Sequence, residues 1–71
     1  MTKYETIASI IEEKIMNLEY EQGEKLPSLK QIMQNYQCSK ATALKAYEVL
    51  QKKHLIYVKH QSGFYVADYG I

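Results

Sequence analysis

The sequence predicts a mainly α domain with a small β-hairpin, and three observations lead to that fold class. Apolar residues recur at helical spacing in three separate segments before residue 54. After residue 54 the spacing changes, and two short runs rich in β-branched and aromatic residues follow. A polar turn that ends in glycine separates the two runs, as a tight hairpin requires.

Length and composition limit the classes of protein to which the chain can belong. Its 71 residues suffice for one domain with one small core, and a hydrophobic content of 46% excludes a disordered tail. No apolar run approaches the roughly 18 residues of a membrane span, and no signal-peptide pattern opens the chain. The single cysteine, Cys38, has no internal disulfide partner. We therefore expect residues 1–71 to form one soluble, cytoplasmic domain that does not contact a membrane.

The first predicted helix covers residues 4–18, where apolar residues line one side and charged residues fall between them. The apolar side consists of Tyr4, Ile7, Ala8, Ile11, Ile15 and Leu18. Gly23 lies in the polar stretch that follows, so the helix should end before it. Leu26 precedes Pro27, which favours an extended backbone at Leu26. We expect a short extra strand or bridge there.

Two serines predict where the next two helices begin. Ser28 and Gln31 form a capping box, in which the serine hydroxyl and the glutamine amide each bind an orphan amide hydrogen. The apolar stripe of this helix is Leu29, Ile32, Met33 and Tyr36. Ser39 is the expected N-cap of a third helix over residues 40–53. One face of that helix carries Ala43, Ala46, Tyr47 and Leu50.

The two extended runs cover residues 55–59 and 64–67, and the polar turn between them is residues 60–63. Phe64 and Tyr65 alternate, so only one of them can face the core. The order of elements is helix, short strand, helix, helix and hairpin. That order is typical of a winged helix-turn-helix with three helices and a two-stranded wing.

A helix-turn-helix presents the first turns of its second helix to the major groove of duplex DNA. The residues at this position are Ser39, Lys40, Ala41 and Thr42, with Lys45 one turn further on. Lys40 suits a guanine edge or a phosphate, Thr42 suits either, and Ala41 is small enough to meet a thymine methyl group.

Ser28 and Lys30 begin the preceding helix, where free amide hydrogens and the helix dipole favour a phosphate. In the alternative interpretation Ser28 and Ser39 only cap helices and the lysines are solvated. Capping and phosphate contact are compatible, so both interpretations stay open at this point.

The charges divide along the chain although the net charge is only +1. Residues 1–27 carry three lysines and six glutamates, whereas residues 28–71 carry six lysines and two acidic residues. The division fits a polar first helix followed by a basic reading surface. A chance scatter of solvated charges is the alternative.

Three segments resemble the successive signatures of the GntR-type winged-helix domain. They are residues 23–28 (Gly-Glu-Lys-Leu-Pro-Ser), 39–42 (Ser-Lys-Ala-Thr) and 62–66 (Ser-Gly-Phe-Tyr-Val). Residues 44–47 resemble the YtrA or MocR branches of that family. The resemblance implies sequence-specific binding of double-stranded operator DNA by a bacterial transcription regulator. It implies phosphate and base contacts at Lys30, Ser39, Lys40, Thr42 and the wing residues His60, Gln61, Ser62 and Gly63.

The resemblance also implies that this domain is one part of a longer regulator. Members of the family carry a C-terminal effector-binding or dimerisation domain, which in the MocR branch is aminotransferase-like and binds pyridoxal phosphate. We expect no cofactor in the present domain, a small-molecule effector that acts only through the missing domain, and a homodimeric parent. The domain by itself should be monomeric.

The chain departs from the family pattern in its basic residues, because it contains no arginine. Lys30 and Lys40 occupy positions where the family favours arginine, and Leu44 occupies another. Lysine lacks the bidentate fork, so base discrimination at these positions should be weaker. His54 stands where the family often has a glycine that ends the helix.

Other functions have less support in the sequence. A winged helix used for protein–protein interaction without DNA binding is the alternative that the low net charge permits. Cys38, His54 and His60 lack the paired spacing of metal ligands, and no catalytic set can be assembled, so we expect neither a metal site nor an enzyme. The tyrosines could stack on nucleic acid, but packing is the favoured interpretation for Tyr4, Tyr36, Tyr47 and Tyr57.

Overall fold

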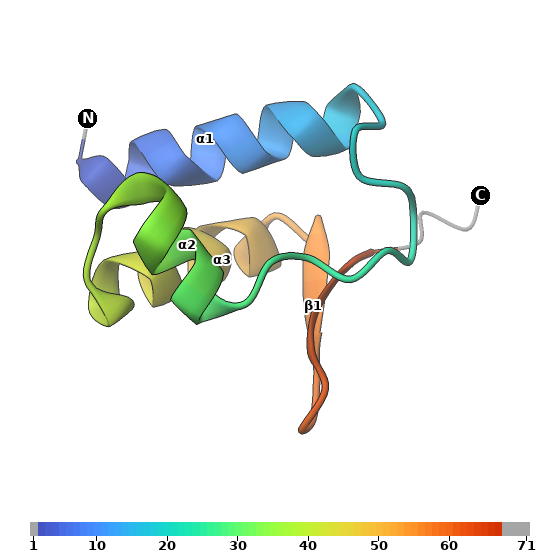
Figure 1. Cartoon of the computed structure of the whole chain (residues 1–71). Helices are drawn as coiled ribbons and strands as arrows, with labels where there is room; N and C mark the ends of the chain where they lie inside the picture. The colour runs from blue at the N-terminus through green and yellow to red at the C-terminus, as the bar shows by residue number, and fades with distance from the viewer. Residues whose placement is uncertain (1, 68–71) are drawn as a thin grey trace.

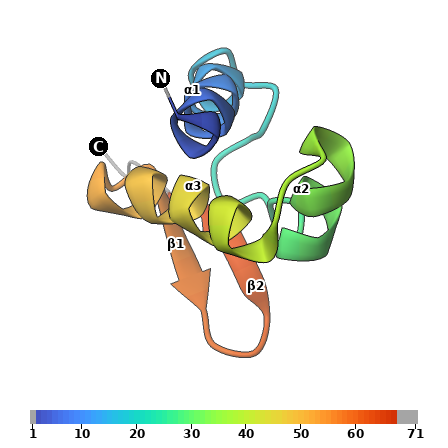
Figure 2. The ribbon, with the colours of Figure 1, turned by 90° about the vertical axis from the view of Figure 1, so that its left-hand side faces the viewer.

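Three helices precede a two-stranded antiparallel hairpin (Figure 1). The structure is a computed structural model and describes residues 2–67. The elements in chain order are α1 (Lys3–Met16), α2 (Leu29–Tyr36), α3 (Lys40–Lys52), β1 (Ile56–Lys59) and β2 (Gly63–Val66). The hairpin projects from the side of α3 that faces away from α1 (Figure 2). This architecture confirms the expected winged helix-turn-helix.

Both predicted helix starts are confirmed by their hydrogen bonds. The Ser28 hydroxyl accepts from the Gln31 amide at 3.2 Å, and the Gln31 side chain accepts from the Ser28 amide at 2.9 Å. Ser39 caps α3 by accepting from the amide of Thr42. A further capping box, which joins Thr2 and Glu5, begins α1. The hydrogen bonds from Thr2 also lower the pKa of the Glu5 carboxyl.

All three helices end at a non-glycine residue in the left-handed conformation. These residues are Leu18 (φ 61°), Gln37 (φ 50°) and His54 (φ 61°). Each is followed by an amide that donates to a carbonyl five residues back, which terminates the helix by satisfying an orphan acceptor. The bonds run from Glu19 to Lys14 (2.9 Å), from Cys38 to Met33 (3.1 Å) and from Leu55 to Leu50 (3.0 Å).

The left-handed turn corrects the predicted end of the first helix. The prediction extended this helix to Leu18 and placed its side chain in the core. Instead α1 ends at Met16, and the Leu18 side chain is 69% exposed. A glycine usually marks such a turn, and here the chain reverses direction before Gly23 without one.

The core lies where α1 crosses α3, and the hairpin closes it from the other side (Figure 2). The predicted faces of both helices are buried except for Leu18 and the partly buried Tyr4, and Tyr47 of α3 is fully buried. The Tyr47 hydroxyl donates to the carbonyl oxygen of Pro27 at 2.6 Å, so this buried polar group is satisfied. The buried residues are Ile7, Ala8, Ile11, Ile15, Leu26, Ile32, Ala43, Ala46, Tyr47, Leu50, Leu55, Ile56 and Val66.

The wing pairs Ile56 with Val66 and Lys59 with Gly63 at its two ends. Phe64 faces the core, where its ring centroid lies 4.4 Å from that of Tyr47. Tyr65 therefore faces outward and stacks on Tyr57 with a centroid distance of 5.7 Å. Only one of the two alternating aromatic residues is inward, as expected.

The packing prediction is confirmed for Tyr4, Tyr36 and Tyr47 and is wrong for Tyr57. Tyr57 is 42% exposed. Its neighbour Ile56 takes the core side of β1, and alternation along a strand then places Tyr57 on the opposite face.

The loop that joins α1 to α2 runs beside β2 like a third strand. Lys25 forms an isolated antiparallel bridge with Tyr65, which confirms the extended segment expected near Leu26. The Leu26 amide donates to the Phe64 carbonyl at 2.8 Å, and the Val66 amide donates to the Glu24 carbonyl at 2.9 Å. The base of the wing is thus tied to the segment that leads into α2.

None of the helices between residues 2 and 67 has both the length and the apolar character that a bilayer crossing requires.

Candidate nucleic-acid interface

The starts of α2 and α3 and the end of the wing turn surround one groove. The groove has a volume of about 450 Å³, and its lining comes from all three segments: Ser28, Leu29, Lys30, Met33, Lys40, Gly63 and Phe64. Leu29, Met33 and Phe64 supply an apolar floor, and two lysines contribute positive charge. The structure therefore brings together four predicted site residues, namely Ser28, Lys30, Lys40 and Gly63.

The first turn of α3 is built around two hydroxyl groups. The Ser39 hydroxyl accepts from the Thr42 amide at 3.2 Å and donates to the Thr42 hydroxyl oxygen at 3.0 Å. The Ser39 oxygen thus serves the cap and its hydrogen is used by the Thr42 hydroxyl, whereas the hydroxyl hydrogen of Thr42 remains able to donate to an external acceptor. Lys40 and Ala41 are exposed beside this pair. The turn offers a donor, a cation and a methyl group on one surface.

The first turn of α2 has the features of an anion site. Ser28 satisfies the amide of Gln31, whereas the amides of Leu29 and Lys30 belong to the helix-terminal donors that have no acceptor within a helix. The positive end of the helix dipole and the exposed ammonium of Lys30 add to the attraction for a phosphate.

The wing turn exposes His60, Gln61 and Ser62. Gln61 (φ 61°) and Gly63 (φ 134°) both have positive φ, and the Ser62 amide donates to the Lys59 carbonyl at 2.9 Å. The Ser62 hydroxyl is hydrogen-bonded to the Tyr65 hydroxyl. The polar side chains of the turn project from a backbone that its own hydrogen bonds hold.

Lys45 lies apart from the groove. Its ammonium is 5.5 Å from the ring centroid of Tyr4, on the side of α3 that faces α1. This cation–π contact gives Lys45 a structural partner. It leaves Lys45 at the edge of the predicted surface rather than among the groove residues.

Two lysines that the sequence prediction did not include lie beside Gly63, where the wing strands meet the turn. A Cβ atom at Gly63 would be 3.1 Å from Cε of Lys25, so the Lys25 side chain crosses directly over that glycine. Lys59 pairs with Gly63 across the hairpin, and its ammonium lies 5.6 Å from the Tyr65 ring centroid. Lys59 was within the lysine-rich half of the chain, but only the bridge to β2 brings Lys25 to this place.

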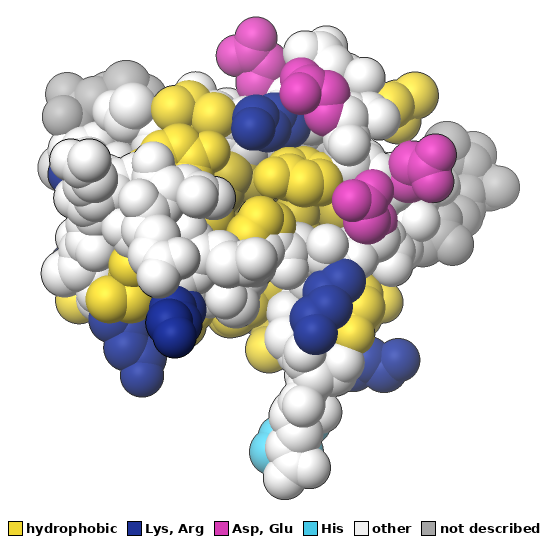
Figure 3. Space-filling model, viewed as in Figure 1, with side chains coloured by type: hydrophobic (Ala, Val, Ile, Leu, Met, Phe, Trp, Pro, Cys, Tyr) yellow, Lys and Arg dark blue, Asp and Glu magenta, His cyan; other side chains and the backbone are white. Residues whose placement is uncertain are grey.

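Acidic side chains gather on one part of the surface, and several lysines lie on another. In Figure 3 the acidic side chains lie over the end of α1 and the loop after it, with a lysine side chain beside them, whereas other lysine side chains lie lower, towards α2 and along the wing. The lysines that the contacts place on that lower side are Lys25, Lys30, Lys40 and Lys59.

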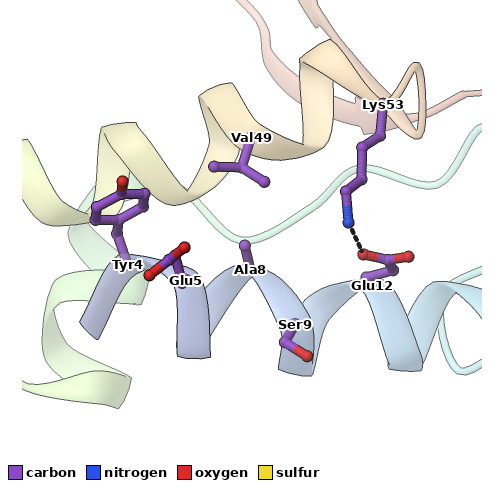
Figure 4. A pocket seen from close by; sticks show the side chains of 7 residues that line it. All are labelled: Tyr4, Glu5, Ala8, Ser9, Glu12, Val49 and Lys53. Atoms are coloured by element: carbon purple, nitrogen blue, oxygen red, sulfur yellow. Dashed lines mark hydrogen bonds and ion pairs between the residues drawn. The ribbon is translucent and has the colours of Figure 1, made fainter. Parts of the chain in front are cut away.

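A second hollow, between α1 and α3, has a different composition (Figure 4). It contains none of the predicted site residues, and an ion pair between Lys53 and Glu12 spans it at 2.9 Å. Both partners are substantially exposed, so the pair should contribute no more than about 1 kcal/mol of stability. The lining is Tyr4, Glu5, Ala8, Ser9, Glu12, Val49 and Lys53. Across residues 2–67, no three histidine, cysteine or acidic side chains gather in a way that could hold a metal ion.

A protein-family model described as bacterial regulatory proteins, gntR family, matches residues 3–66. The chain is 41% identical over 67 residues to the HTH-type transcriptional regulator YcxD of Bacillus subtilis and 39% identical over 69 residues to YydK of the same organism. These matches cover 94% and 97% of the chain but only 15% and 29% of the two relatives.

Solved structures give the same grouping. The DNA-binding domain of AraR, in complex with its operator ORR3, superposes with a TM-score of 0.91 at 27% identity. That match covers 94% of the present chain and 81% of the AraR chain. A GntR family transcriptional regulator from Listeria monocytogenes gives a TM-score of 0.89 at 27% identity, over 94% of the present chain and 59% of its own.

Proposed function

The chain belongs to the gntR family of bacterial regulatory proteins, and from that premise we propose that it binds specific sequences in double-stranded DNA. The first turns of α3 enter the major groove, with Lys40, Ala41 and Thr42 towards base edges. The start of α2 and the wing, with its exposed His60, Gln61 and Ser62, hold the flanking backbone or minor groove.

The groove shared by α2, α3 and the wing is the observation that carries this proposal. Residues that are distant in sequence (Ser28, Lys30, Lys40 and Gly63) line it together. Two cations and the free amides of a helix start are suited to a polyanion, and the exposed first turn of α3 lies beside them. The operator complex of the AraR domain, whose fold matches at a TM-score of 0.91, supports the same mode of binding.

The covered share of the relatives supports a role as one domain of a larger regulator. The chain spans between 14% and 29% of the length of YcxD, YjiR and YydK, which are named as transcriptional regulators. We propose that it is the DNA reader of a cytoplasmic, homodimeric parent. Any effector then acts through another domain, because the reader contributes only the contacts to DNA.

Salt dependence tests the proposal against a protein-interaction module. With about 3–5 lysine–phosphate contacts, the log–log slope of affinity against salt should be roughly −3 to −5 per domain. Fluorescence anisotropy with a duplex selected from a random pool would measure it. A slope near zero, with circular dichroism showing a folded chain, would contradict DNA binding and favour the protein-interaction alternative.

A further inference from the structure

The outward face of α3 carries one large apolar side chain. The inward face is Ala43, Ala46, Tyr47 and Leu50, all fully buried. Leu44 follows Lys40 by one turn, is 38% exposed and belongs neither to the core nor to the residues packed against it. Among residues 2–67 it is also the only exposed large hydrophobic on α3, since the others lie on α1, the loop after it and β1.

Helix formation does not require a leucine at this position. Lysine, glutamate and glutamine have helix propensities close to that of leucine and would leave no apolar surface in water. The neighbours on the same outward face are Ala41 and Glu48, both exposed. Ala41 and Leu44 are three residues apart, so their side chains adjoin and form a small apolar strip between charged groups.

The major groove offers one apolar group to such a strip, which is the C5 methyl of thymine. We propose that Leu44, together with Ala41, contacts a thymine methyl group and makes the protein prefer thymine at that base position. This inference rests on the proposed function, because it assumes that α3 lies in the major groove. It assigns to Leu44 a role in selecting the base, whereas the lysines around it supply affinity.

Removing the methyl group from the DNA tests the contact directly. Starting from the selected duplex, each thymine is replaced in turn by uracil, which lacks only the C5 methyl. Wild-type protein should lose about fourfold in affinity at one or two positions, the value expected for one buried methyl-sized contact. Leu44→Ala should bind the thymine duplex about fourfold more weakly and show no further loss with uracil at those positions. Alanine favours the helix, and Leu44 is not in the core, so the variant should fold.

Ile10→Ala is the matched control, because Ile10 lies on α1 and is 37% exposed. It should retain the full uracil penalty. If Leu44→Ala retains the same penalty as wild type, or if no uracil substitution weakens wild-type binding, the inference is wrong although DNA binding stands. If wild-type protein binds no duplex at all, the proposed function fails and the inference fails with it.

Discussion

At the scale of single residues, the site contains side chains that share one groove but that, in the proposed function, contact different parts of a duplex. Lys30 stands at the first turn of α2, beside amides that suit a phosphate, and Lys40 stands on the first turn of α3. Both line the groove, so position alone does not separate their roles. The helices that carry the two lysines separate their roles: α2 is proposed to contact phosphates, which set the affinity, and α3 to contact bases, which set the sequence preference.

Lys30→Ala should weaken binding to all duplexes by the same factor and reduce the magnitude of the salt slope by about one. Lys40→Ala should also reduce the difference in binding free energy between the selected duplex and a random duplex. The expected reduction is about 1 kcal/mol, because lysine makes weaker base contacts than arginine. Thr42→Ala should reduce the same free-energy difference. Titrations of each variant against selected and scrambled duplexes measure the affinity for each duplex and the difference between them, with Lys14→Ala on α1 as the charge-matched control. Equal losses on both duplexes for Lys40→Ala would contradict its base-reading role.

Tyr47 connects the core to the segment that leads into α2. Tyr47→Phe removes the donor to the Pro27 carbonyl and should cost about 1–2 kcal/mol in the free energy of unfolding. Urea denaturation at neutral pH measures this cost. Tyr57→Phe is the control, because Tyr57 is exposed and should change stability little.

The same residue predicts a dependence on alkaline pH. Burial raises the pKa of the Tyr47 phenol, and the neighbouring phenols of Tyr20 and Tyr36 raise it further. In the unfolded chain this group loses its proton near pH 10, whereas the folded protein retains it. The unfolded state then binds fewer protons, so the contribution to stability is complete below about pH 10 and falls above it. Unfolding titrations from pH 9 to 11 should show a smaller decline for Tyr47→Phe than for wild type; an equal decline would contradict this.

Residue patterns in the sequence predicted those features of burial that depend only on neighbours along the chain. The periodicity of α1 and α3 identified most of their buried residues, and alternation indicated that only one of Phe64 and Tyr65 faces the core, without deciding which. Tyr57 and Lys25 could not be placed in this way. The exposure of Tyr57 depends on which face of the hairpin meets α3, and the position of Lys25 depends on pairing with a strand forty residues later.

At the scale of elements, capping residues marked where α2 and α3 begin, whereas the end of α1 was predicted two residues too late. Ser28 and Ser39 accept the hydrogen bonds that their capping roles require, and Thr2 with Glu5 carries the same recognisable spacing. The ends rely on left-handed residues that are not glycine. The Leu18 side chain gives no indication of that conformation, and at His54 the only indication is the glycine that the family often has there.

His54→Gly should therefore stabilise the protein by about 0.5–1 kcal/mol, because glycine adopts φ near 61° without the steric cost of a side chain. Thermal or urea unfolding measures the change. Lys52→Gly, two residues earlier at the last position of α3, should destabilise by a similar amount. If both variants destabilise, the left-handed strain assigned to His54 is wrong.

At the scale of the whole molecule, the exposed hydrophobic residues do not form a single surface. Ile10 and Met16 lie on α1, Leu44 on α3, and Tyr57 and Val58 on β1. Isolated exposed hydrophobics are normal in monomers, whereas a stable dimer requires a continuous apolar patch. The described residues thus carry the proposed DNA contacts on one side and no large self-complementary apolar face.

We expect the 71-residue chain to be monomeric at micromolar concentration, as measured by analytical ultracentrifugation. A stable dimer would contradict this and would direct attention to α1, which carries Ile10 and Met16. In the proposed parent, dimerisation then comes from another domain, and two linked readers gain avidity that a single one lacks.

The hydrogen bonds between the loop after α1 and β2 also have a kinetic consequence. Leu26 and Val66 donate to backbone on the opposite segment, so the wing base cannot open without releasing the chain that enters α2. These segments should open as one cooperative unit, and their amides should exchange with solvent deuterium at a common slow rate. The wing tip, held only by its local turn, should exchange faster. Because of these hydrogen bonds, the wing and the start of α2 can adjust to a curved partner only together, as one rigid unit rather than as two independent elements.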